Sequence, residues 1–447
     1  MTRARITDLV VVLPGIMGSR LADADGRAVW DLSGGALLRG LRTFGASLDT
    51  LRLPKDIGDA DPGDGIVPVG LMPDLHVVPG IWHPVDGYTD LLRWLERHFT
   101  LSVSDNLLTF PYDWRLSCRH NAERLKGRID LELERWRASA PERREARVVF
   151  LCHSMGGLIA RHYVERLGGH EITRRLITLG TPHRGSPLAL AHLVNGERVL
   201  GLDLGPFARS LPSLHQLAPD YACMTGPGGL AHARDLPGLP GVDPALLADA
   251  ARFHADLRSA PPRAELHAVF GVGQPTATTA HYADDRLLLD VGDGDGDGDG
   301  DGDGTVPRRA ALPTDAAGDD LAGTGSGTPY EQHGSLQNNW GVRNALWGLL
   351  GHTPPVPRDE EPLAALLGVE APALLAAGTP YEVTVTAPHD HLLLTAELCP
   401  ADGNRAAPRT LHSLGGGRYR AAFPPPEQGA YRLSVGRLTA LTLVADR

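Results

Sequence analysis

Short apolar runs recur through much of the chain and alternate with longer segments in which apolar residues return every three or four positions. The runs are Leu9–Leu13, Leu107–Phe110, Val148–Cys152 and Leu176–Leu179, and a further segment, Glu265–Gly271, alternates apolar and polar residues. A short apolar run bounded by turn residues is typical of a strand buried on both faces. We therefore expect these segments to form a central sheet.

Segments with helical periodicity lie between the expected strands. Two of them place their apolar residues on one helix face: Leu91, Leu92, Leu95 and Phe99 in Gly87–Phe99, and Leu125, Ile129, Leu133 and Trp136 in 121–138. A third helix is expected after Gly334 and ends at Gly351, before a run of prolines. Alternating strands and helices predict an α/β fold with a mostly parallel sheet, whose sites lie at the carboxyl ends of the strands.

The pattern changes after residue 352. Prolines and charges indicate a linker, which we place at 353–378. From 379 to 447, short alternating runs between Gly, Pro and Asp turns are typical of a small β-sandwich of immunoglobulin-like type. We therefore expect an α/β domain at 1–352 and an all-β domain at 379–447. Three possibilities stay open for the second domain: it binds a protein partner, it binds another domain, or it is a merely stabilising appendage.

Composition narrows the class of protein. The chain has 447 residues and a formal net charge of −11, which argues against nucleic acid as a partner and against electrostatic adsorption to anionic lipid. The four cysteines have neither CxxC nor paired spacing, so we expect no metal site, disulfide framework or cofactor. The first apolar run is too short for a secretory signal and follows Asp8, which favours a cytoplasmic protein.

The strongest chemical signal lies in Arg147–Leu158, RVVFLCHSMGGL. Here a strand ends in a tight turn that carries Ser154 and leads into a helix, as in the nucleophile elbow GxSxG, with Cys152 in place of the first glycine. The alternative is an ordinary helix-capping serine in a Gly-rich turn. Small residues on both sides of the serine favour the elbow.

A glycine-containing loop, Pro14–Ser19, follows the first expected strand. A hydrolase with this elbow holds its oxyanion with two backbone N–H groups, one just after the nucleophile and one from a loop after an earlier strand. Met155 and Ile16 are the candidate donors. Without Ser154, the loop would read equally well as a plain turn that ends a strand.

Several motifs occur in an order that resembles the lecithin:cholesterol acyltransferase family, which includes lysosomal-type phospholipase A2 and phospholipid:diacylglycerol acyltransferases. They are VVVLPGIMGSRL at Val10, PYDWR at Pro111, CHSMGG at Cys152, GTPHRGSP at Gly180, FGVGQPT at Phe270 and GDGTVP at Gly302. The resemblance implies an α/β-hydrolase fold over 1–352 with a cap at about 189–262. It also implies a Ser-Asp-His triad that acts on lipid esters.

The resemblance assigns the other members of the triad. Asp303 is the acid because Thr305-Val306-Pro307 aligns it with the GDGTVP motif, and Asp301 is the alternative in a shifted register. His333 precedes the last helix, where an α/β hydrolase places its base, and His352 is the weaker candidate. His153, next to the nucleophile, is expected to pack against the elbow or to orient it.

Two polar segments invite more than one interpretation. Asp113 and Arg115 in PYDWR could form a buried ion pair that shapes the site, or belong to a surface turn with a helix cap. Asp293–Gly304 repeats Asp-Gly and suggests calcium, but no glutamate falls at the last position of an EF-hand loop in any register. We therefore favour a solvated loop without metal.

These features predict a serine lipid esterase or O-acyltransferase that acts on phospholipid or other fatty-acyl esters. The chemistry up to the acyl-enzyme is common to both reactions, so hydrolysis and transfer stay open. Leu211, Leu214 and Leu217 in the cap could line an acyl pocket or form the cap's own core. The cap is also the expected place for transient contact with a membrane surface. The rival interpretation is a non-enzymatic lipid-binding module whose β-domain recruits a partner.

Overall fold

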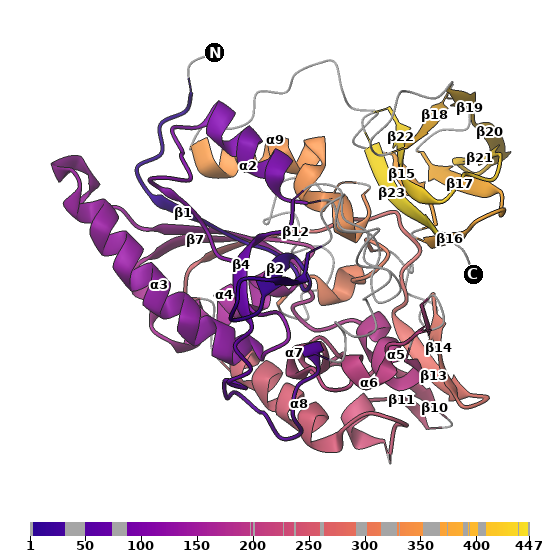
Figure 1. Ribbon diagram of the computed structural model, residues 1–447, viewed down its shortest axis with the longest axis horizontal. Helices are drawn as coiled ribbons and strands as arrows, with labels where there is room; N and C mark the ends of the chain where they lie inside the picture. Colours follow the sequence, from indigo (N-terminus) through magenta and orange to yellow (C-terminus); the bar gives the residue numbers. More distant parts are fainter. Residues whose placement is uncertain are drawn as a thin grey trace.

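The computed structural model is shown in Figure 1. It describes residues 3–31, 50–73, 87–196, 198–199, 202–226, 228–236, 238–259, 263–291, 302–313, 329, 331–351, 367–372, 374–387, 392, 394–400, 408–436 and 438–445. None of the helices in this part of the chain combines the length and the apolar character needed to cross a bilayer.

A parallel sheet of five strands in the order β12-β7-β6-β1-β5 forms the centre of the α/β part. Its strands are β1 Leu9–Leu13, β5 Leu107–Thr109, β6 Val148–His153, β7 Thr173–Leu179 and β12 Glu265–Val269. All the expected strands are present, with ends shifted by up to three residues. Every residue of β1 and β6 is buried, because both faces of the sheet are covered.

Helices cover the two faces of this sheet (Figure 1). Leu9, Val11 and Leu13 share a core with α3 Cys118–Ala138 and α4 Met155–Arg166. Val10 and Val12 instead pack with α2 Thr89–His98 and α9 Trp340–Gly351. The alternation of β1 side chains between these cores follows from the two-residue period of a strand. The sheet is therefore the middle layer of three.

Helix α3 begins at Cys118, three residues before the expected start at Asn121. The Ser117 hydroxyl accepts a hydrogen bond from the N–H of His120 at 3.0 Å, so it caps an additional turn. Helix α8, Pro244–Arg258, is capped in the same way, with the Asp243 carboxylate accepting from the N–H of Ala245 at 2.8 Å.

Short helices and a second sheet follow β7. The helices are α5 Pro187–Asn195, α6 Gly205–Ala208, α7 Pro212–Gln216 and α8. The sheet runs β11-β10-β13-β14, from β10 Met224–Gly226, β11 Gly229–Ala231, β13 Thr279–Ala283 and β14 Arg286–Asp290. Hairpin β13–β14 comes from outside 189–262, so segments before and after β12 complete one sheet.

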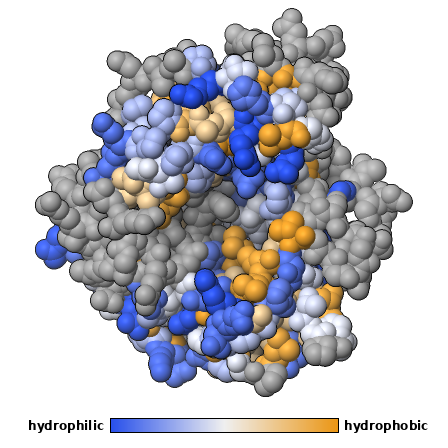
Figure 2. Space-filling view, turned by 90° about the vertical axis from the view of Figure 1, so that its right-hand side faces the viewer, coloured by the Kyte–Doolittle hydropathy of each residue, from blue (hydrophilic) through white to orange (hydrophobic). Residues whose placement is uncertain are grey.

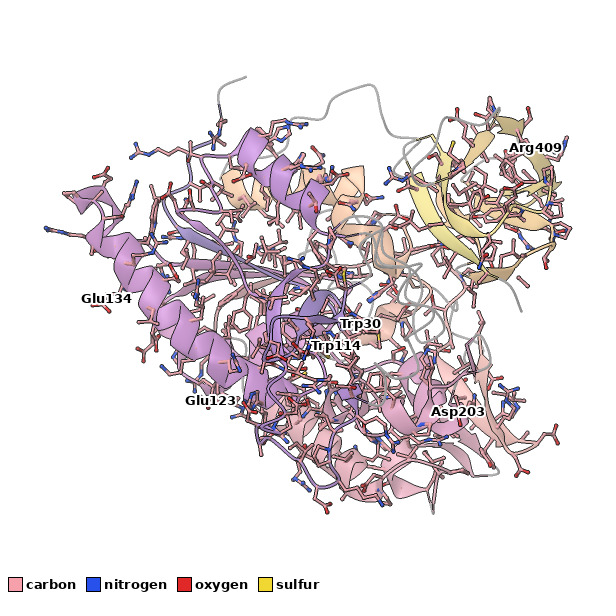
Figure 3. The ribbon with its side chains drawn as sticks, viewed as in Figure 1. Trp30, Trp114, Glu123, Glu134, Asp203 and Arg409 are labelled. Atoms are coloured by element: carbon pink, nitrogen blue, oxygen red, sulfur yellow. The ribbon has the colours of Figure 1, made fainter. Side chains whose placement is uncertain are left out.

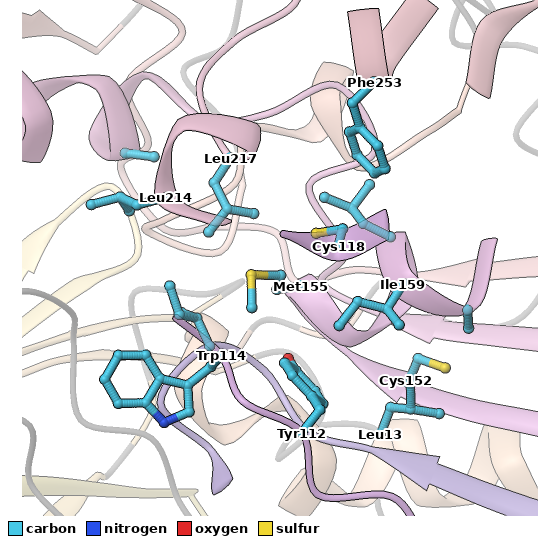
Figure 4. Close-up of a cluster of buried hydrophobic side chains, with 14 of the residues drawn as sticks. Leu13, Tyr112, Trp114, Cys118, Cys152, Met155, Ile159, Leu214, Leu217 and Phe253 are labelled. Atoms are coloured by element: carbon cyan, nitrogen blue, oxygen red, sulfur yellow. The ribbon is translucent and has the colours of Figure 1, made fainter. Parts of the chain in front are cut away.

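Leu211, Leu214 and Leu217 have at most 1% of their surface exposed and join the core that contains Met155. Figure 4 shows Leu214 and Leu217 facing Met155 across this cluster. The leucines therefore pack as core residues, but in the core of the α/β part and not in a separate core of the cap. These leucines attach the segment after β7 to the elbow helix α4.

Smaller elements complete the α/β part. β2 Ser19–Ala22, β3 Ala28–Trp30 and β4 Val67–Leu71 form a sheet in the order β3-β2-β4, and β8 Arg198–Val199 pairs with β9 Leu202–Asp203. Short 3₁₀ helices occupy Pro141–Arg143, Gly169–Glu171, Ala233–Asp235, Arg308–Ala310 and His333–Asn338. The last of these is η6.

The C-terminal region forms two sheets around a separate core, as expected for a β-sandwich. One sheet is β15-β17-β21-β20 and the other is β16-β23-β22-β18-β19. The strands are β15 Gly368–Glu370, β16 Leu374–Ala376, β17 Tyr381–Thr386, β18 Thr395–Pro400, β19 Arg409–Thr410, β20 His412–Gly415, β21 Arg418–Phe423, β22 Gly429–Val435 and β23 Leu438–Ala445.

Two of these strands, β15 and β16, lie within 353–378, which the sequence pattern assigned to the linker. β15 pairs with β17, whereas β16 pairs with β23 at the other end of the region. Each is only three residues long, too short for alternation to be recognised, and its pairing is what defines it as a strand. The sandwich therefore includes Gly368 and the residues after it.

Asp113 and Arg115 form the buried ion pair that the sequence suggested. The fully buried Arg115 guanidinium donates to the Asp113 carboxylate at 2.7 Å and also to the Asp64 carboxylate at 2.7 Å. The contact between Arg115 and Asp64 joins the turn after β5 to the segment before β4. Breaking such a pair leaves an uncompensated charge in the interior.

Replacing Arg115 with leucine should lower the free energy of unfolding by about 3–5 kcal/mol, because Asp113 remains buried without its cation. Urea denaturation followed by circular dichroism measures the loss. Arg27→Leu is the matched control, because the Arg27 ion pairs with Asp23 and Asp25 lie at the surface and should contribute less than about 1 kcal/mol. Equal losses in the two variants would contradict a buried, desolvated pair.

Candidate active site

Ser154 lies at the sharp turn between β6 and α4. Its φ of 52° and ψ of −127° place a non-glycine residue in a sparsely populated backbone region. Three hydrogen bonds hold it there: its N–H donates to Leu179 O at 2.8 Å, and its carbonyl accepts from Gly157 N at 3.0 Å and from Thr181 Oγ1 at 2.8 Å. This strained strand-to-helix turn is the geometry of a nucleophile elbow.

Close packing explains the small residues of the elbow. A Cβ added to Gly156 would lie 2.5 Å from Pro14 O, and one added to Gly157 would lie 2.1 Å from Thr181 Oγ1. Neither site has room for a side chain. Cys152 fills the position of the missing first glycine as a fully buried residue. Burial raises the pKa of its thiol well above the usual value, so Cys152 stays protonated.

The structure brings together the three residues that the sequence singled out. His333 Nε2 lies 2.8 Å from Ser154 Oγ, and His333 Nδ1 lies 2.8 Å from Asp303 Oδ2. A carboxylate only accepts, so Nδ1 carries the proton and Nε2 is free to accept from the serine hydroxyl. At most 5% of each residue's surface is exposed. The alternatives Asp301 and His352 lie outside the described residues.

Asp303 is fixed by its own loop. Its Oδ1 accepts from the N–H groups of Thr305 at 3.0 Å and Val306 at 2.7 Å, which leaves Oδ2 for the imidazole. The Asp303 carbonyl also accepts from the N–H of His333 at 2.8 Å. His333 is the first residue of η6, so it begins a short helix instead of lying in a plain loop. Backbone and side-chain contacts thus set the same Asp303–His333 geometry.

Gly180 permits this close approach, and sequence reasoning did not single it out. Its φ is +59°, in the left-handed region, and an added Cβ would lie 3.0 Å from both Asp303 Oδ2 and His333 Nδ1. The one feature of the sequence that could have pointed to Gly180 was its place at the start of the GTPHRGSP motif. Any larger residue would wedge between the sheet edge and the acid–base pair.

A second missed residue, Tyr88, connects three parts of the site through His153. His153 Nε2 lies 2.9 Å from His333 O, and only a protonated nitrogen can donate to that carbonyl. His153 Nδ1 therefore accepts from the Tyr88 hydroxyl at 2.9 Å, and Tyr88 Oη accepts from the N–H of Gly15 at 2.8 Å. We call this chain of hydrogen bonds the Tyr88–His153 relay. Burial raises the pKa of Tyr88 well above its usual value, so its hydroxyl stays protonated.

Aromatic side chains also hold the loop that follows β1. Tyr112 Oη donates to Pro14 O at 2.8 Å, Trp30 Nε1 to Met17 O at 3.1 Å, and Trp114 Nε1 to Ser19 O at 3.2 Å. The two tryptophan rings lie 5.1 Å apart near the centre of the molecule (Figure 3). The loop is therefore held at several points by groups from distant segments.

This loop passes directly against Ser154. A Cβ added to Gly15 would lie 3.0 Å from Ser154 Cβ. The relay occupies the N–H of Gly15, whereas the N–H groups of Ile16 and Met155 have no acceptor among the described residues. Met155 is the first residue of α4, where helix N–H groups have no partner within the helix. Both predicted donors remain available for a ligand.

No group of three His, Cys, Asp or Glu side chains in the described ranges is arranged to hold a metal ion. The Asp-Gly repeat lies outside these ranges up to Asp301, and Gly302 is the first residue of its end that the structure describes. Whether the earlier units of the repeat bind calcium therefore stays a prediction.

A parallel sheet between two layers of helices, with Ser154 at the end of a strand, is an α/β-hydrolase fold. The family described as lecithin:cholesterol acyltransferase matches residues 84–204. This segment contains the elbow and Gly180, so the resemblance carried by the motifs is confirmed there. The match supports lipid ester hydrolysis or acyl transfer in general. Comparison with curated proteins gives no match.

Three solved structures show distant similarity to the chain. Bacillus licheniformis lipase BlEst2 in propeptide form is 13% identical, with a TM-score of 0.36, over 97% of this chain and 73% of that one. A mutant thermostable endoglucanase from Alicyclobacillus acidocaldarius is 20% identical, with a TM-score of 0.15, over 16% of this chain and 13% of that one. An engineered protein is 14% identical, with a TM-score of 0.18, over 67% and 55%. The fold assignment rests on the sheet described above.

Replacing Tyr88 with phenylalanine should lower the free energy of unfolding by about 1–3 kcal/mol, because the Gly15 N–H and His153 Nδ1 lose their partner in the interior. Urea denaturation measures the change. Tyr163→Phe is the matched control: Tyr163 is equally buried, and its hydroxyl makes no hydrogen bond to the described residues. A loss no larger than that of the control would show that the relay does not stabilise the fold.

Proposed function

We propose that this chain is a serine lipid esterase or O-acyltransferase that acts on phospholipid or other fatty-acyl esters through an acyl-enzyme at Ser154. The observation that carries the proposal is the position of His333, 2.8 Å from both Ser154 Oγ and Asp303 Oδ2. A serine hydroxyl is a poor nucleophile at its normal pKa, and a base in hydrogen-bond contact activates it. The lipid substrate class rests on the family match at 84–204.

In this mechanism Ser154 Oγ attacks the ester carbonyl while its proton passes to His333 Nε2. The Asp303 carboxylate keeps the imidazole in the required tautomer and stabilises the imidazolium that forms. The N–H groups of Ile16 and Met155 donate to the oxyanion of the tetrahedral intermediate, each contributing about 3–4 kcal/mol. His333 then protonates the leaving alcohol, and the acyl group remains on Ser154.

The second half of the reaction decides between hydrolysis and transfer. Water or an alcohol gives its proton to His333 and attacks the acyl-enzyme, which releases a fatty acid or a new ester. Burial of all three residues keeps bulk water from the site, which strengthens each electrostatic contact. Mass spectrometry of the products from a phospholipid and an added alcohol distinguishes the two outcomes and also identifies the cleaved position.

Access to lipid is proposed through the sheet β11-β10-β13-β14. The face shown in Figure 2 has apolar side chains in its lower and upper halves, interspersed with hydrophilic ones. Large apolar residues on or next to hairpin β13–β14 are exposed: Tyr282 by 41%, Leu288 by 41% and Val291 by 59%. The register pairs Tyr282 with Leu287 and Leu288 with His281, so Tyr282 and Leu288 lie on opposite faces of the hairpin, and the proposed transient contact with a bilayer or micelle involves the hairpin as a protrusion instead of one flat apolar patch.

Ser154→Ala should lower kcat for ester turnover by about 10⁴-fold or more and abolish labelling by a fluorophosphonate probe, because no other group takes the place of the nucleophile. Probe labelling on a gel and fatty-acid release from phospholipid vesicles are the two measurements. Ser104→Ala makes the same chemical change on the surface and should leave both unchanged. Persistent turnover in Ser154→Ala would disprove the assignment. Lipid binding by the unaltered protein without probe labelling would favour the non-enzymatic binding module.

Asp303→Asn should lower kcat by about 10⁴-fold without loss of folding, because an amide in this position favours the wrong tautomer of His333. Asp301→Asn places the same change one repeat earlier and should retain activity. Steady-state kinetics on a soluble acyl ester, with circular dichroism as a check on folding, provides the comparison. The reverse result would move the triad acid to Asp301.

A further inference from the structure

The segment that carries His333 is attached to the C-terminal β-sandwich on both sides of the histidine. The side-chain amide of Gln332 donates to Val369 O in β15. The Ser335 hydroxyl donates to Thr439 O in β23 at 3.4 Å. Both acceptors belong to strands on the side of the sandwich that faces the α/β part (Figure 1). Residues from each end of the sandwich sequence therefore meet the same turn of η6.

Strand β15 also contacts the segment beside Asp303. Gln274 lies against Gly368, where an added Cβ would be only 2.4 Å from Gln274 Nε2. The backbone of Gln274 pairs with the acid loop: its N–H donates to Gly302 O at 3.1 Å, and it forms a β-bridge with Asp303. One short strand of the sandwich thus lies against the neighbours of both the acid and the base.

The position of Gln332 at the start of η6 shows why its contact with β15 affects the placement of His333. Gln332 is the N-cap residue of η6, yet its side chain makes no capping bond within the helix. Its amide is directed to β15 instead, so the start of η6 is anchored by a carbonyl from another part of the chain. A short 3₁₀ helix has poor internal hydrogen-bond geometry and depends on such external contacts. Leu374 of β16 adds apolar contact with the core that contains the elbow.

We propose that the β-sandwich is a built-in support for the base, and that Gln332 and Ser335 are positioning residues that fix His333 toward Ser154. The inference rests on the proposed function, in which His333 is the base. Neither side chain needs to touch the substrate. Their contacts restrict the imidazole, and small displacements of a catalytic group cost large factors in rate. The sandwich then contributes to the geometry of the active site, which goes beyond the binding and stabilising roles that the sequence left open.

The double variant Gln332→Ala/Ser335→Ala in the full chain tests this proposal. We expect kcat on a soluble acyl ester to fall by about 10- to 100-fold with KM little changed, because substrate binding is intact and only the base is misplaced. The rate of fluorophosphonate labelling should fall in parallel. The matched control is Gln428→Ala/Ser413→Ala, which makes the same two changes at exposed positions of the sandwich and should retain normal kcat.

A second variant separates positioning from folding. Gln332→Glu keeps the length of the side chain but replaces the donating amide with an acceptor that faces Val369 O, and it should show the same loss of kcat. Rates are expressed per active site titrated with the fluorophosphonate, so a smaller folded fraction does not count as slower chemistry. Normal kcat per titrated site in both variants would overturn the proposal. Turnover that persists in Ser154→Ala would instead overturn the proposed function, so the two failures are distinguishable.

Discussion

The left-handed backbone of Ser154 is the constraint on which the rest of the site depends. A side chain in this conformation costs of the order of 1–3 kcal/mol, and it persists only where the surroundings hold it. Here β7 supplies Leu179 O, the loop after β7 supplies Thr181 Oγ1, and α4 supplies Gly157 N. These contacts require three segments to converge at one sheet edge. The need for space at Gly156, Gly157 and Gly180 follows from that convergence.

Polar contacts in the interior connect the elbow to the loop after β1 and to the segment that carries His333. The Tyr88–His153 relay joins the loop after β1 to the backbone of His333, and its hydrogen bonds fit the His153 tautomer with the proton on Nε2. Fully satisfied buried networks of this kind are rigid, because each unpaired member would cost more than its hydrogen bond contributes. The proposed oxyanion donors and the proposed base are therefore positioned by one network.

The nucleophile and the base differ in what supports them. The backbone contacts of Ser154 within the described ranges all come from elements of the α/β part, within its sheet and the loops at its edge. His333 has supports in both parts of the chain: Asp303 O and His153 in one, and β15 and β23 through its neighbours in the other. Movement of the sandwich would therefore act on the base before it acts on the nucleophile. In the proposed mechanism this asymmetry makes the sandwich a determinant of turnover.

The sequence by itself determined the five strands of the central sheet, the helices α2, α3 and α9, the elbow and the chain order of Ser154, Asp303 and His333, because periodicity and short motifs are local properties. It also indicated the Asp113–Arg115 pair, since two residues in one turn can be judged from their spacing. Tyr88, Gly180 and the three-residue strands β15 and β16 were decided only by the tertiary structure. Each acquires its meaning from a partner far away in the sequence: Gly15 for Tyr88, the acid–base pair for Gly180, and Gln332 for β15. No local pattern encodes a contact whose two halves become neighbours only when the chain has folded.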